Sequence, residues 1–235
     1  MRFQTLSLLI PLLFAACGRM SSMQSSTTDI PSLQSGTGGG ASEIKSLNLV
    51  GSPQMIPLNG YSIPVYPGLT VGTTETDYSL TLTGYGVMKK TVLIVTVDVY
   101  LAASYVTESQ FPIHSDPLGR LESAPVKALQ MTLVRDVSGD QLKAALADAL
   151  SLNGSDPNDP KFVSLFSPLS NGLKAGDTTL TISYTKGGID TVLSLTTSQS
   201  QAVQGSGLGM DIWKIWFGAT DDDNSTALKN ALIGS

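Results

Sequence analysis

The amino-acid sequence predicts an α+β fold, in which a large, mainly antiparallel sheet is covered on one face by a layer of helices. The prediction rests on the order of the elements along the chain. Strand patterns come first, helical patterns follow, a hairpin comes next, and two further helices end the chain. Because strands and helices do not alternate regularly, a parallel sheet built from βαβ units is not expected.

Two stretches in the first half predict strands of this sheet. Residues 77–84 alternate apolar and polar side chains, with Tyr78 and Leu80 on one face. Residues 91–106, TVLIVTVDVYLAASYV, are rich in β-branched side chains and predict one long buried strand. A membrane-spanning helix is not expected there, because it needs about 20 apolar residues and this shorter run contains Asp98.

Glycines and prolines predict the connections between these strands. Gly84 and Gly86 predict a turn before the long apolar run. Residues 56–72 contain several prolines and glycines, which favour an edge or loop segment over a central strand. Residues 107–125 have the composition of a loop.

A capping box marks the clearest helix in the chain. Ser138 is followed three residues later by Gln141, an apolar stripe begins at Leu142, and Asn153 with the next glycine supplies a stop. The preceding residues, 126–136, predict another strand of the sheet.

The last third of the chain predicts a hairpin between helices. Residues 159–172 predict a second helix, which Pro168 shortens. Residues 178–185 and 189–197 predict two strands joined by a turn containing two glycines. Two short helices are expected at the end of the chain, over residues 208–218 and 224–234.

The N-terminal region predicts export. Residues 1–16 combine a basic start, an apolar stretch and a small-residue end, which is typical of a signal peptide. The motif LFAAC, ending at Cys17, resembles the lipobox of bacterial lipoproteins, and Gly18 resembles a sorting context for the outer membrane. We therefore expect lipidation of Cys17, a flexible Ser/Gly-rich tether over residues 17–55, and a folded domain over residues 56–235. The expected location is the periplasmic side of the outer membrane of a bacterial cell envelope.

Composition excludes some classes of function. The net charge is -5 with a pI near 4.7, and no basic run exceeds two residues, so a nucleic-acid footprint is absent. The single histidine, His114, lies between Pro112 and Pro117, so we expect it to be a solvated loop residue. The acidic residues 221–223 favour capping of the last helix over calcium binding. We expect no metal and no cofactor.

Other distinctive residues have structural interpretations. Trp213, Trp216 and Phe217 are spaced as the buried stripe of a helix. Asp98 faces outward or is an acid with a shifted pKa in a cleft, and Lys89 is one of its possible partners.

Three motifs resemble the chalcone isomerase fold family, specifically its bacterial chalcone isomerase-like branch. They are LTGYGVMKK followed by VDVYLAASYV, then LVRDVSGDQL, then IWKIWFG followed by LKNALIG, and they span roughly residues 66–234. The resemblance implies an open-faced β-sandwich of chalcone isomerase type, with a cleft between sheet and helices that holds a flavonoid in plant enzymes or an acyl chain in fatty-acid-binding relatives.

The resemblance also implies where cleft residues lie. The family's catalytic arginine falls at Met88, its strand threonine near Val95, and its helical tyrosine and asparagine at Leu142 and Ala149. The C-terminal threonine falls near Ser198. Because the first four side chains donate no hydrogen bond, they offer nothing to stabilise the charge that develops on the substrate oxygen during ring closure.

These observations lead to one hypothesis and two alternatives. The leading hypothesis is an exported, lipid-anchored, non-catalytic domain that binds an apolar, fatty-acid-like small molecule in the sheet-helix cleft. An alternative is an isomerase or intramolecular lyase that acts on another substrate through Lys89, Tyr85 or Ser198, which would require these groups to converge. Another is an envelope protein-interaction module with a filled core, without a cavity of roughly 300 Å³. No particular protein partner is predicted.

Overall fold

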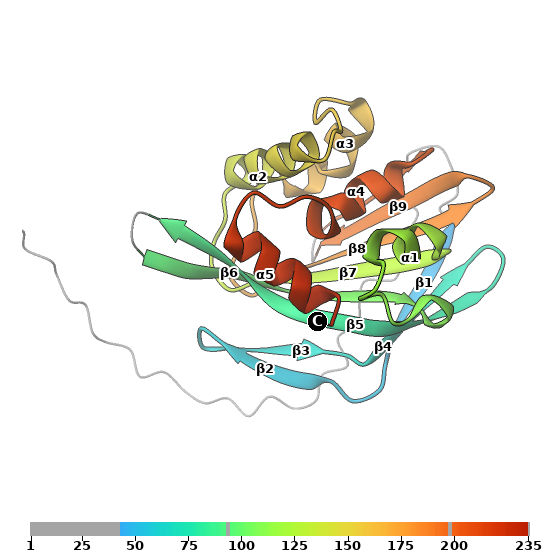
Figure 1. The fold of residues 1–235 in the computed structure, drawn as a ribbon, viewed down its shortest axis with the longest axis horizontal. Helices are drawn as coiled ribbons and strands as arrows, with labels where there is room; N and C mark the ends of the chain where they lie inside the picture. The colour runs from blue at the N-terminus through green and yellow to red at the C-terminus, as the bar shows by residue number, and fades with distance from the viewer. Residues whose placement is uncertain (1–42, 93–94, 197–198, 235) are drawn as a thin grey trace, which may run out of the picture.

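The computed structural model describes residues 43–92, 95–196 and 199–234 of the chain. Eight strands form one antiparallel sheet in the order β1-β4-β5-β6-β7-β8-β9-β10, and β2 pairs only with β3 (Figure 1). The strands are β1 (Ile44–Val50), β2 (Gln54–Leu58), β3 (Tyr61–Val65), β4 (Gly68–Thr73), β5 (Asp77–Val92), β6 (Val95–Thr107), β7 (Val126–Leu133), β8 (Thr178–Lys186), β9 (Ile189–Thr196) and β10 (Ser200–Gly205).

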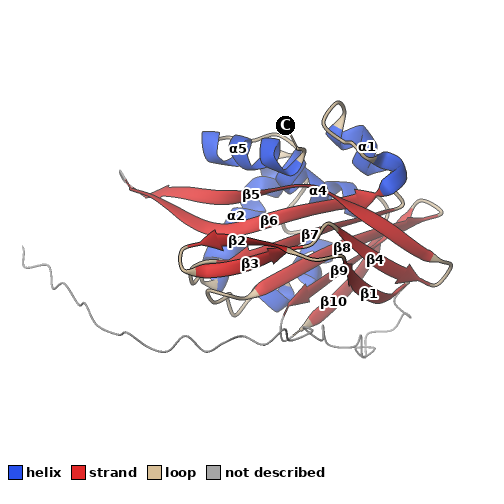
Figure 2. Cartoon of the chain, turned by 90° about the horizontal axis from the view of Figure 1, so that it is seen from below, coloured by secondary structure: helices blue, strands red, loops and turns tan. Residues whose placement is uncertain are grey.

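The helices lie on one face of this sheet, as Figures 1 and 2 show. They are α1 (Pro117–Ser123), α2 (Gly139–Leu152), α3 (Pro160–Leu165), α4 (Leu208–Phe217) and α5 (Asp223–Leu232), with the short 3-10 helices η1 (Glu108–Gln110) and η2 (Ser167–Leu169). The predicted α+β class and the large antiparallel sheet with a helical layer are confirmed.

The core between the sheet and the helices is built around α4. Trp213 and Phe217 are fully buried and Trp216 is 9% exposed, which confirms the predicted aromatic stripe. The indole N–H of Trp213 donates to the hydroxyl of Ser183 on β8 at 3.0 Å. Burying each aromatic side chain removes a large apolar area from water, so α4 is the central helix of this layer.

The opposite face of the sheet has its own core, which the β2–β3 hairpin covers (Figure 2). Ile63 and Val65 of β3 are buried in one apolar cluster with Leu101 and Tyr105 of β6. Tyr78 and Leu80 of β5 join the same cluster, as their alternation predicted.

The expected long strand over residues 91–106 is in fact parts of two strands. β5 ends at Val92 and β6 begins at Val95, whose side chain is 58% exposed. The prediction was wrong because no glycine, proline or asparagine separates the two strands in the sequence. Every residue of β6 from Leu101 to Thr107 is buried, so only this half is covered on both faces.

The turn predicted at Gly84 and Gly86 is also wrong, because β5 passes through both residues. These glycines provide room for α5. A Cβ atom on Gly84 would overlap the main-chain oxygen of Ala231, and one on Gly86 would lie 2.6 Å from the Ala231 Cβ. The Thr83 hydroxyl donates to the Leu232 carbonyl at 2.8 Å beside them, which fixes the end of α5 on the strand.

Folded structure begins before the expected domain boundary. β1 and the first residues of β2 lie within residues 17–55, which the sequence assigned to the tether. β1 pairs with β4, and Ile44 is 1% exposed. The folded domain therefore starts upstream of residue 56. The predicted signal peptide and Cys17 lie outside the described residues.

Two further elements, α1 and β10, were not predicted from the sequence. The expected loop 107–125 contains α1, whose N-cap Asp116 accepts a hydrogen bond from the Gly119 N–H at 3.1 Å. The polar strand β10 pairs with β9 at the edge of the sheet. No helix within the described ranges is both long and apolar enough to cross a membrane.

Candidate functional site

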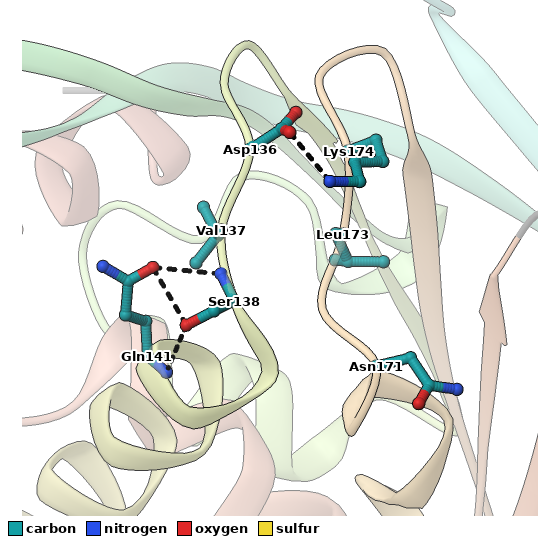
Figure 3. A pocket seen from close by; sticks show the side chains of 7 residues that line it. All are labelled: Asp136, Val137, Ser138, Gln141, Asn171, Leu173 and Lys174. Atoms are coloured by element: carbon teal, nitrogen blue, oxygen red, sulfur yellow. Dashed lines mark hydrogen bonds and ion pairs between the residues drawn. The ribbon is translucent and has the colours of Figure 1, made fainter.

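A pocket of about 350 Å³ opens between two connections at one end of the helical layer (Figure 3). One connection joins β7 to α2, and the other joins η2 to β8. Its lining combines polar and apolar side chains, which are Asp136, Val137, Ser138, Gln141, Asn171, Leu173 and Lys174.

The two connections are joined by main-chain hydrogen bonds. The Val137 N–H donates to the Leu173 carbonyl and the Leu173 N–H donates to the Val137 carbonyl, both at 2.9 Å. Gly172 has a positive φ of 78°, and a Cβ on it would lie 2.6 Å from the Val137 oxygen. This position therefore requires glycine, because the left-handed conformation and the close approach both oppose a side chain.

The capping box predicted for α2 forms one wall of the pocket. The Gln141 N–H donates to the Ser138 hydroxyl at 3.3 Å, and the Ser138 N–H donates to Gln141 Oε1 at 3.0 Å (Figure 3). These bonds satisfy main-chain groups at the start of the helix and hold both side chains in place.

An ion pair closes the outer end of the pocket. Lys174 Nζ lies 2.9 Å from Asp136 Oδ2, and the Ala175 N–H donates to Asp136 Oδ1 at 3.0 Å. The hydrogen bond from Lys174 lowers the pKa of the Asp136 carboxyl, with the bond from Ala175 as the second cause. The same hydrogen bond raises the pKa of Lys174. The pair therefore adds little net charge to the pocket.

The inner side of the pocket is a filled apolar cluster. Leu173 and Val137 belong to a cluster that also contains Leu133 of β7, Leu142 of α2 and Tyr100 of β6. Burial raises the pKa of Tyr100 to about 12, so its hydroxyl remains protonated at neutral pH. The space between the sheet and α2 is thus occupied here by side chains.

The residues expected to line the family cleft do not line this pocket. Leu142 packs in the cluster beneath it, next to Gln141 in sequence. Met88 is half-buried against the core around α4, and Ala149 is half-buried on α2. Val95 projects at the exposed end of the β5–β6 hairpin.

The weak catalytic candidates are not brought together. Tyr85 packs in the core on the face opposite the helices. Lys89 lies four residues further along β5, about 13 Å away at 3.3 Å per residue, and its side chain is 52% exposed. Its ammonium lies 3.8 Å from Asp98 Oδ1, which identifies the partner of that acid. Ser198 lies outside the described residues.

The acidic residues near 222 and the single histidine do not form a binding site with other side chains in the part of the chain that the structure describes. Asp222 is the N-cap of α5 and accepts a hydrogen bond from the Ser225 N–H at 2.9 Å, as the capping interpretation predicted. His114 is exposed in the turn before α1. Within the part of the chain that the structure describes, no three His, Cys, Asp or Glu side chains gather as a metal site.

The sequence indicated only one wall of the pocket. The capping box pointed to Ser138 and Gln141. Asn171 lies at the end of the helix predicted over residues 159–172, and Lys174 lies just after it, where no element was predicted. The dipeptide Asn171-Gly172 was a usable turn signal. The approach of Lys174 to Asp136 had no sequence signal, because it depends on how the two connections cross.

Comparison with known proteins agrees with the architecture. The sequence model of the chalcone isomerase-like family matches residues 69–234, from the second residue of β4 through α5. A comparison with curated proteins finds no match. The family match covers the helical layer and every strand of the large sheet except β1, and it includes all the residues that line the pocket. The chain therefore belongs to the chalcone isomerase-like family.

Proposed function

We propose that this chain is an exported, lipid-anchored chalcone isomerase-like domain that binds a small ligand without transforming it. The pocket between the β7–α2 and η2–β8 connections carries the proposal. Its volume of about 350 Å³ falls at the lower end of the range of roughly 300–1,000 Å³ that small-molecule sites occupy.

The lining of the pocket favours a ligand with one apolar side. Val137 and Leu173 connect the pocket to the apolar cluster beneath α2, and they offer contact to a short apolar chain. The amide groups of Asn171 and Gln141, from the two opposite walls, can form hydrogen bonds with polar atoms of a ligand. A fatty-acid-like molecule with a short apolar chain and a polar head fits this mixed lining.

The absence of catalysis is inferred from the side chains at the family's active-site positions. Met88, Val95, Leu142 and Ala149 cannot donate a hydrogen bond to a developing oxyanion. Tyr85 packs in the core opposite the helices, whereas the Lys89 side chain is 52% exposed beside Asp98, so the two groups do not line one site.

Native mass spectrometry of the full chain, incubated with fatty acids and flavonoids, tests the ligand. We expect a fatty-acid adduct that Asn171→Trp removes by filling the pocket, while Ser109→Trp, on exposed η1, retains it. An equal adduct in both variants, or none in the unchanged chain, would contradict binding in this pocket. Conversion of a chalcone in the same mixture would contradict the non-catalytic assignment.

The anchor is tested independently of the pocket. In bacteria fed a labelled fatty acid, we expect label on the unchanged chain and its loss in Cys17→Ser, because the thiol is the expected acylation site. Ser22→Ala, in the same segment, serves as the control and should keep the label. If the label persists in Cys17→Ser, the acylated residue is not Cys17.

A further inference from the structure

Two opposite charges lie at the outer end of the pocket (Figure 3). Among the described residues that line it, Lys174 is the one basic side chain and Asp136 the one acidic side chain. Lys174 Nζ donates to Asp136 Oδ2 at 2.9 Å, and the two side chains are 77% and 63% exposed. Exposed ion pairs contribute little to the free energy of unfolding, so the placement of these charges bears on binding more than on stability.

Three side-chain oxygen atoms of the lining already accept hydrogen bonds from the protein. Asp136 Oδ1 accepts from the Ala175 N–H at 3.0 Å, and Oδ2 accepts from Lys174. Gln141 Oε1 accepts from both the N–H and the hydroxyl of Ser138. These bonds reduce the acceptor capacity that remains for a ligand, which favours a ligand that brings acceptors of its own.

The ammonium of Lys174 has donors to offer such a ligand. An ammonium carries three N–H groups, and the bond to Asp136 takes one of them. The flexible side chain can turn while the main chain stays in place, because the Lys174 N–H donates to Asp177 Oδ2 at 2.7 Å. The ammonium can therefore hold a ligand acceptor without releasing Asp136, whose other oxygen is bound by Ala175.

Charge and space narrow the ligand further. A carboxylate and an ammonium attract each other as opposite charges, whereas an alcohol brings no charge. A dianion such as a phosphate monoester would place a second negative charge beside Asp136. Beneath the pocket, Leu133 is 0% exposed and Leu173 is 5% exposed, so the apolar floor is closed. The lining thus fits a single negative charge on a short apolar chain.

We propose that Lys174 selects the head group of the ligand, and that the ligand is a short-chain monocarboxylate whose carboxylate accepts a hydrogen bond from this ammonium. The inference rests on the ligand-binding function proposed above. Asp136 opposes the selection, because its charge repels the carboxylate. The apolar chain lies against Val137 and Leu173, so the chain contributes affinity and the head group contributes the preference for an acid.

NMR titrations of the full chain with hexanoate, hexanol and hexylamine test the head group, because the three ligands share one apolar chain. We expect the unchanged chain to bind hexanoate at least about threefold more tightly than hexanol. The preference for the acid should grow in Asp136→Asn, disappear in Lys174→Met and survive in Lys174→Arg. Lys45→Met, an exposed lysine of β1 outside the lining, is the matched control and should keep the preference of the unchanged chain.

The outcomes separate this assignment from the proposed function. Equal affinities for the acid and the alcohol in the unchanged chain, or a preference for the acid that survives Lys174→Met, would overturn the role of Lys174 and leave ligand binding standing. Tighter binding of hexylamine than of hexanoate would overturn it as well, because Asp136 would then select the head group. Absence of binding of all three ligands would contradict the proposed function itself, and this assignment with it.

Discussion

Lys127 shows how strongly one position can depart from what its residue type suggests. The side chain is 1% exposed on β7, and its ammonium donates only a long hydrogen bond of 3.4 Å to the Ala124 carbonyl. Desolvation lowers its pKa from 10.5 to about 8, although the charges of Asp190 and Glu122 act in the opposite direction. Lys127 is the second residue of the strand predicted over residues 126–136, and this position gave no sign of its burial.

The buried lysine makes stability depend on pH. The pKa of Lys127 is lower in the folded chain than in the unfolded chain, so the charged side chain lowers the free energy of unfolding below about pH 8. The free energy of unfolding rises again as the pH increases from about 8 to 10.5. The pKa difference corresponds to about 3 kcal/mol. We therefore expect Lys127→Met to be more stable than the unchanged chain at pH 7, with an advantage that shrinks by about 2 kcal/mol by pH 10.

Urea denaturation of both proteins at pH 7 and pH 10 measures this change. Comparing the two proteins removes the contribution of tyrosines and other groups that titrate in the same range. An advantage that stays constant between the two pH values would show that Lys127 titrates normally in the folded state.

At the scale of elements, α5 and β5 illustrate how a glycine pattern can mislead. Gly84 and Gly86 resemble a turn in the sequence, but their role is to let a helix more than 140 residues away in sequence lie directly on the strand. The capping box at Ser138 and the glycine turn between β8 and β9 depend only on local geometry, and both predictions were confirmed.

Gly84→Ala tests the close approach of α5. The new methyl group would meet main-chain atoms of Ala231, which cannot rotate away, so we expect a loss of about 1–3 kcal/mol in the free energy of unfolding. Gly205→Ala, on β10, is the matched control, because its Cβ would meet the Leu208 Cβ at an ordinary 3.5 Å. Equal stability of the two variants in urea denaturation would mean that α5 moves freely on the sheet.

At the scale of the whole molecule, the folded domain extends beyond the region that motifs identify. β1 adds an edge strand to the large sheet, and the β2–β3 hairpin covers the face without helices (Figure 2). The polar character of residues 17–42 concealed this boundary, although the apolar side chains of β1, which are Ile44, Leu47, Leu49 and Val50, follow directly.

Truncation tests where the folded domain begins. A chain starting at residue 43 should keep the thermal midpoint of the full chain. A chain starting at residue 56 loses β1 and the buried Ile44, worth about 2 kcal/mol for that side chain alone, so its midpoint should fall by at least about 5 °C. Equal midpoints in calorimetry would restore the boundary expected from the sequence.

The sequence by itself determined the features that depend on neighbours along the chain. The α+β class, the capped helix α2, the β8–β9 hairpin and the aromatic stripe of α4 follow from periodicity, caps and turn residues, which act within a few positions. The family motifs added the architecture and the expectation that polar catalytic groups are replaced by Met88, Val95, Leu142 and Ala149.

Only the tertiary structure decided the features that depend on distant segments meeting. It separated β5 from β6, placed α5 on Gly84, buried Lys127, and brought Lys174 to Asp136 across the pocket. The position of a side chain relative to segments far away in sequence depends on how strands register and layers pack, and no local pattern of residues encodes that arrangement.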